Sequence, residues 1–360
     1  MELASEVISD SNAMQARTLV MAHGHNATAY QILNPGIRYW FSGAGDAVAG
    51  YTRRRGWILA AGEPVCAAGR LQAAIEEFEQ FAAKQKCKVC YVCASDALRR
   101  LGSNQHAAVT MGAQPVWNPA LWPAIVGSRR SLRAQLHRSR NKGVRIEQRD
   151  TEGAGSEPEI RRVLQEWLAS RHLPPMHFMV EPDVLSGVAG DRLLFTAMCA
   201  GRLVAFLVAS PVAARNGYLI EELARSPHAP NGASELLIDS AMAHLAAEGC
   251  TFVTMGLVAL ASGTAGGNPL WVRGLMNMAR AHANRFYNFR GLEHFRAKMQ
   301  PESWEPVYLI SNEKRFSPQA LYAVGGAFSQ ISPMRAIAIA LLKGAREEVR
   351  WLARKLGVSR

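Results

Sequence analysis

The chain has 360 residues, of which 49% are hydrophobic and 19% are charged, a composition that excludes an intrinsically disordered protein. A chain of this length exceeds the usual size of a single core, so we expect two domains or two halves. The 41 Lys and Arg residues outnumber the 29 Asp and Glu residues and give a formal net charge of +12. This excess fits a polyanionic partner, such as RNA or an anionic membrane, and fits a generally basic proteome equally well.

Residues 1–22 are predicted to form an N-terminal extension. The segment has acids near its start and no apolar core, so it does not read as a secretory signal. The nearest candidate for a membrane span, residues 320–342, is interrupted by a Gly-Gly pair, a Ser-Pro pair and Arg335. We therefore expect a cytoplasmic protein, either free in solution or peripheral on the inner face of the membrane.

A first half is predicted over residues 23–149. Three strand-like runs, GIRYWFSG, AVAGYTRR and GWILAAG, are separated by glycine-rich turns. A helix follows, in which Leu71, Ile75, Phe78 and Phe81 are spaced to form one apolar face. The strands VCYVC and AAVTMG come next, on either side of the short helical run DALRRLG.

Three of the six cysteines occur in the run CKVCYVC, which raises the question of a metal site. The run alternates like a strand, so Cys90 is predicted on the opposite face from Cys87 and Cys93. Three thiols arranged in this way cannot converge on one ion. The sequence therefore favours buried, reduced cysteines and no metal.

A basic run covers residues 128–149, and residues 128–145 are predicted to form a helix. The run contains a single acid, Glu147. Five of its cations are the candidate ligands for phosphate groups: Arg129, Arg130, Arg133, Arg138 and Lys142. A solvated helix face is the alternative, but such faces usually mix both signs of charge.

After a polar linker at residues 150–159, a second half is predicted over residues 160–312. It repeats the order of the first half: two strands in a hairpin (DRLLFTAMCAG and RLVAFLVASPV), the strand YLIEEL, a helix from GASELL onward, and the strand CTFVTMG. Strands, a helix and a strand in the same order twice predict an α/β or α+β fold duplicated within one chain.

The segment EELARSPHAPNGASELL, residues 221–237, joins the strand to the helix of the second half. Arg225 follows the strand, and Asn231-Gly232 leads into the helix, whose N-terminus can hold a phosphate or a carboxylate. Glu221 and Glu222 alternate, so only one of them is expected at a cleft. An ordinary connecting loop with capping residues explains the same pattern.

The segment FYNFRGLEHFRAKMQPESWEPVYLI, residues 286–310, mixes aromatic and basic side chains. This composition fits a stacking platform with a phosphate clamp. A core strand preceded by an amphipathic helix fits it as well. The chain contains no nucleophile elbow, P-loop or dinucleotide fingerprint, which favours direct transfer over a covalent intermediate.

Taken together, these segments resemble the catalytic domain of the phosphatidylglycerol lysyltransferases, or aminoacyl-phosphatidylglycerol synthases. The resemblance runs from about Gly24 to Ile310, and the segment 286–310 is similar to the closing motif of the family. RSPHAPNGASELL, TMGLVAL, GWILAAGEPVC and MGAQPVWNP resemble its other motifs. Two positions depart from the family pattern: Glu222 replaces an aspartate, and Val307 replaces an arginine.

The resemblance implies two fused GNAT-like folds that transfer an amino acid from aminoacyl-tRNA to a lipid hydroxyl, with no cofactor. It implies catalytic roles for Glu222, Arg225, Lys298 and Tyr308, and substrate binding by Asn231, Gly232, Asn288, Arg290 and Glu305. The basic helix would bind the tRNA or the anionic headgroup. Full-length family members carry an N-terminal flippase with several membrane spans, which we expect to be missing from this chain.

Residues 313–360 are predicted to form a basic, amphipathic helical tail, suited either to an anionic membrane surface or to packing on the domain. Two other functions stay open at this point. One is a GNAT-type acyltransferase that uses acyl-CoA or acyl carrier protein on an amine or hydroxyl. The other is a non-catalytic relative that binds tRNA or membrane.

Overall fold

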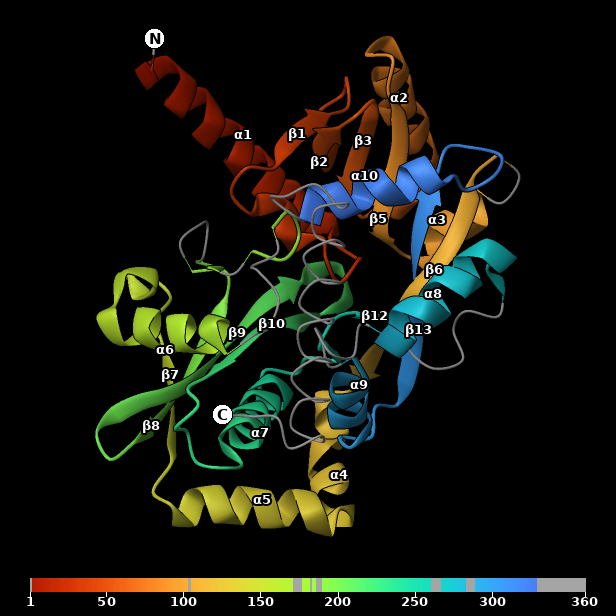
Figure 1. The fold of residues 1–360 in the computed structure, drawn as a ribbon. Helices are drawn as coiled ribbons and strands as arrows, with labels where there is room; N and C mark the ends of the chain where they lie inside the picture. Colours follow the sequence, from red (N-terminus) through yellow and green to blue (C-terminus); the bar gives the residue numbers. More distant parts are fainter. Residues whose placement is uncertain are drawn as a thin grey trace, which may run out of the picture.

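The computed structural model describes residues 2–102, 105–170, 177–181, 183–185, 190–259, 267–282 and 289–328. One mixed sheet runs through these residues, in the strand order β1-β2-β3-β5-β13-β6-β11-β10-β9-β8-β7 (Figure 1). The strands are β1 (Arg38–Phe41), β2 (Ala47–Arg54), β3 (Trp57–Ala61), β4 (Val65–Cys66), β5 (Lys88–Ala94), β6 (Ala107–Trp117), β7 (Arg145–Arg149), β8 (Leu193–Cys199), β9 (Arg202–Val212), β10 (Gly217–Arg225), β11 (Phe252–Thr254), β12 (Val258–Ala259) and β13 (Ser303–Ser311).

Helices cover both faces of this sheet. They are α1 (Glu2–His23), α2 (Leu71–Lys84), α3 (Asp96–Leu101), α4 (Trp122–Ser128), α5 (Arg130–Asn141), α6 (Pro158–Ala169), α7 (Ala233–Ala247), α8 (Leu270–His282), α9 (Phe289–Ala297) and α10 (Pro318–Phe328). In the part of the chain that is described, none of them is long and apolar enough to cross a bilayer.

The predicted repeat is confirmed. In the first half, β1, β2 and β3 are antiparallel, and α2 leads to β5, which is parallel to β3. In the second half, β8, β9 and β10 are antiparallel, and α7 leads to β11, which is parallel to β10. The apolar face predicted for α2 packs on the sheet, with Ile75 and Phe78 buried and Leu71 and Phe81 partly buried.

The two halves exchange strands. β13, from the end of the second half, lies between β5 and β6. β7, from the end of the first half, pairs with β8 at the far edge of the sheet. The domain boundaries expected from the chain order stay a prediction, but the sheet interleaves the two segments that they separate.

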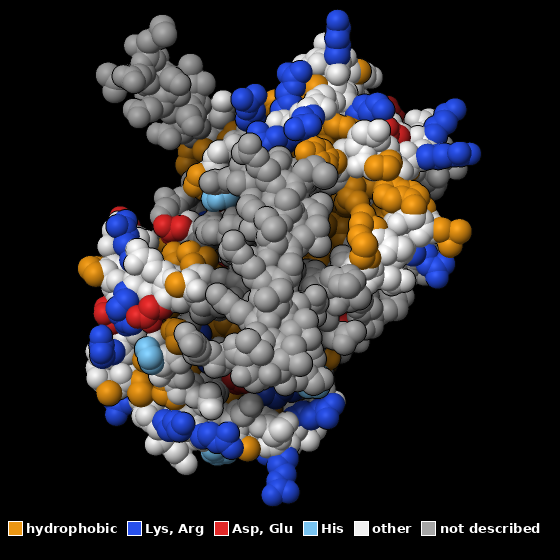
Figure 2. Space-filling view, in the orientation of Figure 1, with side chains coloured by type: hydrophobic (Ala, Val, Ile, Leu, Met, Phe, Trp, Pro, Cys, Tyr) orange, Lys and Arg blue, Asp and Glu red, His pale blue; other side chains and the backbone are white. Residues whose placement is uncertain are grey.

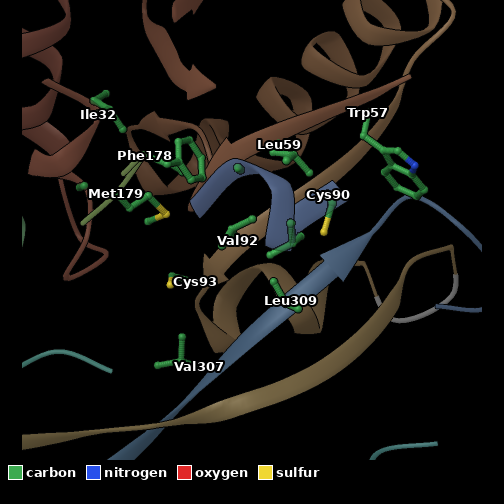
Figure 3. Close-up of a cluster of buried hydrophobic side chains, with 14 of the residues drawn as sticks. Ile32, Trp57, Leu59, Cys90, Val92, Cys93, Phe178, Met179, Val307 and Leu309 are labelled. Atoms are coloured by element: carbon green, nitrogen blue, oxygen red, sulfur yellow. The ribbon is translucent and has the colours of Figure 1, made fainter. Parts of the chain in front are cut away.

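Apolar side chains fill both sides of the sheet. One cluster lies between the strands of the first half and helices α1 and α10, and Figure 3 shows Cys90, Val92 and Cys93 of β5 beside Val307 and Leu309 of β13. The opposite face packs against α2 and α3. In the second half, α5 and α7 cover one face and α6 covers the other.

The cysteine prediction is right about burial and wrong about one face. Cys87, Cys90 and Cys93 are buried free thiols. Cys93, however, packs in the same cluster as Cys90, whereas Cys87 lies in the cluster on the opposite face. Cys93 is a bulged residue with φ of +58°, skipped in the pairing of β5 with β13, and a bulge shifts the alternation by one residue.

The basic run is divided more finely than predicted. The helix expected over 128–145 is α5, from Arg130 to Asn141, preceded by the separate helix α4 and followed by strand β7. Gly143, with φ of +79°, directs the chain from the end of α5 toward that strand. Leu132, Leu136 and Ser139 form the buried side of α5.

Candidate functional site

The parallel strands β10 and β11 separate after three residues. Their pairing runs from Gly217–Phe252 to Leu219–Thr254, after which β10 continues to Arg225 while β11 ends. The chain beyond β11 turns to β12, which pairs with β6. Main-chain N–H and C=O groups that lose a strand partner must bond to side chains, water or a ligand. This β10–β11 divergence is therefore the best candidate for a binding site in the sheet.

Local sequence explains the divergence. Gly256 adopts φ of +71°, a left-handed conformation that suits glycine, and a Cβ there would lie 3.2 Å from Leu219 Cδ1. Arg296 of α9 donates to the Gly256 carbonyl oxygen at 2.8 Å. The segment that leaves β11 is thus turned by a glycine and held by an arginine of the closing motif.

Glu222 and Arg225 both lie on the part of β10 beyond the divergence, but on opposite faces. Glu222 pairs with Val208, whose side chain packs with α6, and Arg225 pairs with Ala205, whose side chain packs with α5 and α7. Directly opposed residues of antiparallel strands share a face. Glu222 is buried, with 5% of its surface exposed, and Arg225 is half-buried.

The neighbouring acid, Glu221, is occupied by a structural contact. The pairing of β10 with β9 skips Glu221, which makes it a bulge residue. Its Oε2 accepts a hydrogen bond from Arg192 Nε at 3.1 Å, and both side chains are almost fully buried. Arg192 also donates to Asn34 Oδ1 at 3.1 Å and stacks on the Tyr30 ring. Glu221 is therefore a structural residue, and Glu222 is kept as the candidate because the family resemblance implies a catalytic role for it.

A polar cluster joins α5, α7 and the end of α9. Lys298 Nζ lies 3.2 Å from Glu235 Oε1 in the first turn of α7 and donates to Gln135 Oε1 of α5. Glu235 and Lys298 have side chains that are 9% and 21% exposed. Because an ionised carboxylate is costly to bury without a partner, Lys298 and Glu235 stabilise each other here. Neither Gln135 nor Glu235 was predicted; the only signal was an acid in the otherwise apolar start of α7.

Gly232 connects this cluster to the loop before α7. It adopts φ of +96°, and a Cβ at this position would lie 2.5 Å from the Gln135 carbonyl oxygen and 3.2 Å from Ser139 Cβ. The N-terminus of α7 therefore packs directly on the backbone of α5, which only glycine allows. Asn231, next to it, is exposed.

Two predicted residues of the closing motif lie elsewhere, on β13, and β6 and β11 separate that strand from β10. Glu305 accepts from both terminal nitrogens of Arg215, at 2.7 and 2.8 Å, and from Gln114 at 2.9 Å. Burial alone would raise the pKa of Glu305, but these hydrogen bonds outweigh it, and the pKa lies below its ordinary value. Glu305 thus forms a charge-paired contact between strands and the segment before β10.

Tyr308 faces the first half. Its hydroxyl lies 3.3 Å from Asp96 Oδ1, and the Arg99 guanidinium stacks on its ring. Burial and the Asp96 carboxylate raise the pKa of Tyr308 above its usual value, which keeps the hydroxyl protonated. Asn288 lies outside the described residues, and Arg290 lies in α9 with its side chain outside them.

The cations of the basic run are largely exposed on and around α5, where Figure 2 shows Lys and Arg at the lower edge of the molecule. Arg129, Arg130, Arg138 and Lys142 are exposed. Arg133 is half-buried and donates to the carbonyl oxygens of Val126, at 3.2 Å, and Gly127 at the end of α4. Arg133 therefore contributes to helix packing, and the other four present the charge.

The sheet contains two repeats of antiparallel strands, a helix and a parallel strand, and the parallel strands of the second repeat diverge. This arrangement defines a tandem GNAT-like fold. The chain belongs to the phosphatidylglycerol lysyltransferase C-terminal family, whose sequence model matches residues 17–311. The family predicted from the closing motif is therefore confirmed.

Solved structures agree in fold. The C-terminal domain of a protein described as a lysylphosphatidylglycerol synthetase, from Agrobacterium fabrum, has a TM-score of 0.73 at 21% identity, covering 89% of this chain and 98% of that one. L-PGS from Bacillus licheniformis has a TM-score of 0.71 at 19% identity, covering 87% and 95%.

A curated relative extends the comparison in sequence. The phosphatidylglycerol lysyltransferase of Bacillus subtilis is 23% identical over 167 residues, which are 46% of this chain and 19% of that protein. The matched region thus spans only a small part of the relative.

Proposed function

We propose that this chain transfers an aminoacyl group from aminoacyl-tRNA to a hydroxyl of phosphatidylglycerol. The observation that carries the proposal is the family match over residues 17–311, which includes the β10–β11 divergence and both candidate residues on it. The donor, the lipid acceptor and a peripheral position on an anionic membrane all belong to the proposal.

The proposed reaction exchanges one ester for another. The acceptor hydroxyl oxygen bonds to the carbonyl carbon of the aminoacyl ester, the bond to the ribose oxygen of the tRNA breaks, and the hydroxyl proton ends on that ribose oxygen. Negative charge develops on the carbonyl oxygen in between, so fixed positive groups accelerate the step. A base that takes the proton and returns it supplies the remaining assistance.

The described residues support a division of roles. Arg225 lies on the α7 face of β10, the face against which α5, α7 and α9 also pack, and it is assigned to the developing negative charge or to a phosphate. Glu222, on the other face, is assigned to the aminoacyl ammonium or to the acceptor proton. A substrate between the diverging strands would contact both faces, which accounts for the placement of the two groups on opposite sides.

Lys298 and Tyr308 take secondary roles in this proposal. Lys298 carries a positive charge held at the start of α7 by Glu235 and Gln135, and it adds to the potential that Arg225 provides. Tyr308 and Glu305 lie on β13, which β6 and β11 separate from β10, so they are assigned to supporting the sheet and not to the chemical step. Asn231 is exposed at the loop before α7, where it can donate to a substrate.

The tRNA is proposed to bind along α5. Arg129, Arg130, Arg138 and Lys142 offer exposed cations in a region with few acids. Asp239 is one such acid, and it is already paired with Arg140 at 2.7 Å. Because Gly232 packs on α5, a tRNA on this helix lies next to the N-terminus of α7. The acceptor end would then reach the divergence without crossing the protein.

The test is a transfer assay with purified protein, labelled lysyl-tRNA and phosphatidylglycerol in micelles, with the product lipid identified by mass spectrometry. Arg225→Ala should lower the rate by about 100-fold, the usual cost of one donor to a developing oxyanion. Arg38→Ala, which removes an exposed arginine from β1 in the first half, is the matched control and should change the rate less than about twofold.

Two results would contradict the proposal. One is that the wild-type protein forms no aminoacyl lipid from any aminoacyl-tRNA but uses acyl-CoA in its place. The other is that Arg225→Ala transfers as fast as the control variant.

A further inference from the structure

Helix α8 carries apolar side chains on two separate faces. Val272 and Met276, one turn apart, pack into the cluster on the α10 side of the sheet. Four other large apolar side chains of the helix point outward and are exposed: Leu270 (81%), Trp271 (39%), Leu275 (38%) and Met278 (57%). At 100° per residue these four fall within one sector of the helix, distinct from the buried one. A helix already anchored on one side thus presents a second apolar stripe to the surroundings.

The anchoring of α8 is firm. Asn268, just before the helix, accepts from the Thr110 backbone N–H at 2.8 Å and donates to the Thr110 carbonyl oxygen at 3.0 Å. This pair of bonds ties the start of α8 to β6, and Asn268 itself is buried. The outward stripe is therefore a fixed feature of the fold that needs no refolding to be presented.

Exposed cations lie within α8 itself and beside α10, which packs on the same side of the sheet. The sequence of α8, LWVRGLMNMARAH, contains no acid. Arg54 donates to the Gly326 carbonyl oxygen of α10, and Arg55 stacks on Tyr322 of that helix. Arg54 and Arg55 are exposed, as are Arg273 of α8 and Lys314 and Arg315 in the segment between β13 and α10. The acid Glu313 is already paired with Lys88.

We infer that the outward face of α8 docks on an anionic lipid bilayer. Leu270, Trp271, Leu275 and Met278 would enter the boundary between headgroups and acyl chains, and these exposed cations would meet lipid phosphates. Leu and Met gain free energy in an apolar medium, and Trp prefers the membrane interface. An anionic bilayer fits a surface on which apolar residues are flanked by cations. A protein partner would more commonly require both signs of charge on the surface that it contacts.

Figure 2 shows hydrophobic side chains gathered on the side of the molecule where Figure 1 places α8 and the strands beside it, with Lys and Arg around them. The choice of a lipid as occupant rests on the proposed function, because a phosphatidylglycerol acceptor must be taken from a bilayer. Binding to vesicles can nevertheless be measured without any transfer.

The experiment measures co-sedimentation of the purified full chain with vesicles, in the absence of tRNA. Vesicles contain equal amounts of phosphatidylglycerol and phosphatidylcholine, or phosphatidylcholine alone. The double variant Leu270→Glu/Met278→Glu should lower partitioning onto the phosphatidylglycerol vesicles by about tenfold or more, through lost apolar burial and added negative charge. The matched control is Leu101→Glu, an exposed leucine of α3 on the opposite face of the sheet (50% exposed), which should bind like wild type.

A second readout separates docking from chemistry. Transfer to a short-chain, water-soluble phosphatidylglycerol should proceed at the wild-type rate in the double variant, which also shows that the variant is folded. Vesicle binding that depends on α8 while no protein shows transfer would leave the docking inference standing and remove the proposed function.

Three outcomes overturn the inference: wild-type protein that does not bind phosphatidylglycerol vesicles, a double variant that binds as well as wild type, or light scattering that shows a wild-type dimer broken by the double variant. The last result would make the stripe a contact between copies of the chain.

Discussion

The two halves share one order of elements but treat their parallel strands differently. In the first half, β3 and β5 pair over five residues, from Trp57–Lys88 to Ala61–Val92, and Gly62 continues with a hydrogen bond to the Val92 carbonyl oxygen. In the second half, β10 and β11 pair over three residues and then diverge. Where the two strands stay paired, their backbone N–H and C=O groups are hydrogen-bonded within the fold. Where the strands diverge, these groups are left for another partner.

The acids that follow or end these strands differ in the same way. Glu63, just after β3, accepts from Asn26 Nδ2 at 2.9 Å and from the Ser95 backbone N–H at 3.1 Å, so it is part of the structure of a closed half. Glu222 lies on the part of β10 that continues after its pairing with β11 has ended. We therefore propose that the first half acts as a scaffold and that the second half carries the chemistry.

The strongest test of this division between the two halves is to neutralise Glu222 and Glu63 in turn. Glu222→Gln should lower aminoacyl transfer by about 100-fold, since an amide neither accepts a proton nor pairs with an ammonium. Glu63→Gln should change transfer less than about threefold and lower the free energy of unfolding by about 1 kcal/mol through weakened hydrogen bonds. Rates come from the transfer assay and stabilities from urea unfolding. Equal losses of transfer in the two variants would mean that the halves are not divided in this way.

The helices that follow the strands show a second contrast. α2 packs an aromatic group, Phe78 and Phe81 with Trp40 and Tyr51, on the first half. α7 begins with the buried Glu235, which is paired with Lys298. A charged pair at this position, where the first half uses apolar packing, indicates a requirement other than stability.

Removing one partner of that pair sharpens the contrast. Lys298→Met should lower the free energy of unfolding by about 2–3 kcal/mol, because it leaves the Glu235 carboxylate buried without its cation. The double variant Lys298→Met/Glu235→Leu should regain most of this stability yet still transfer slowly. Urea unfolding of the two single variants and the double variant gives the coupling energy. A double variant with wild-type transfer would show that the pair is structural only.

Much of the fold could be predicted from the sequence, because the relevant signals are local. The spacing of Ile75 and Phe78 fixes the buried face of α2, and strand-like runs with glycine turns mark both hairpins. The exchange of β7 and β13 could not be predicted, since pairing such as Tyr308 with Ala94 joins distant segments and leaves no periodic trace. Bulges caused the error at Cys93, because one extra residue reverses every later assignment of faces.

The candidate site was predicted less completely, because its contacts also join segments that are distant in the sequence. Sequence analysis singled out Glu222 and Arg225 as members of one site. Their separation of three residues puts them on opposite faces of a strand, and only the register with β9 shows what each face packs against. The divergence of β10 from β11 depends on Gly256 and on Arg296, which reaches it from a distant helix. Glu235 gave no signal beyond its charge, because its partner Lys298 comes from far along the chain.

The smallest expected effect concerns the first half alone, in which the parallel strands β3 and β5 stay paired. His106 Nε2 lies 2.6 Å from Glu79 Oε1, to which the Tyr91 hydroxyl also donates at 3.0 Å. The hydrogen bond with Glu79 raises the pKa of His106, against an opposing contribution from burial. Because the folded pKa exceeds the unfolded one, the contribution of this pair to stability is fully present below the unfolded pKa, about 6.5, and is lost as the pH rises through the folded pKa.

The difference in unfolding free energy between wild type and His106→Gln should therefore be largest near pH 5.5 and should shrink by pH 9. Urea unfolding at both pH values measures it. The ratio of the transfer rates of the two proteins should stay the same across this range, because His106 belongs to the scaffold and not to the divergent strands. A transfer rate that follows the titration of His106 would instead connect the closed half to the chemistry, and the division between the halves would have to be abandoned.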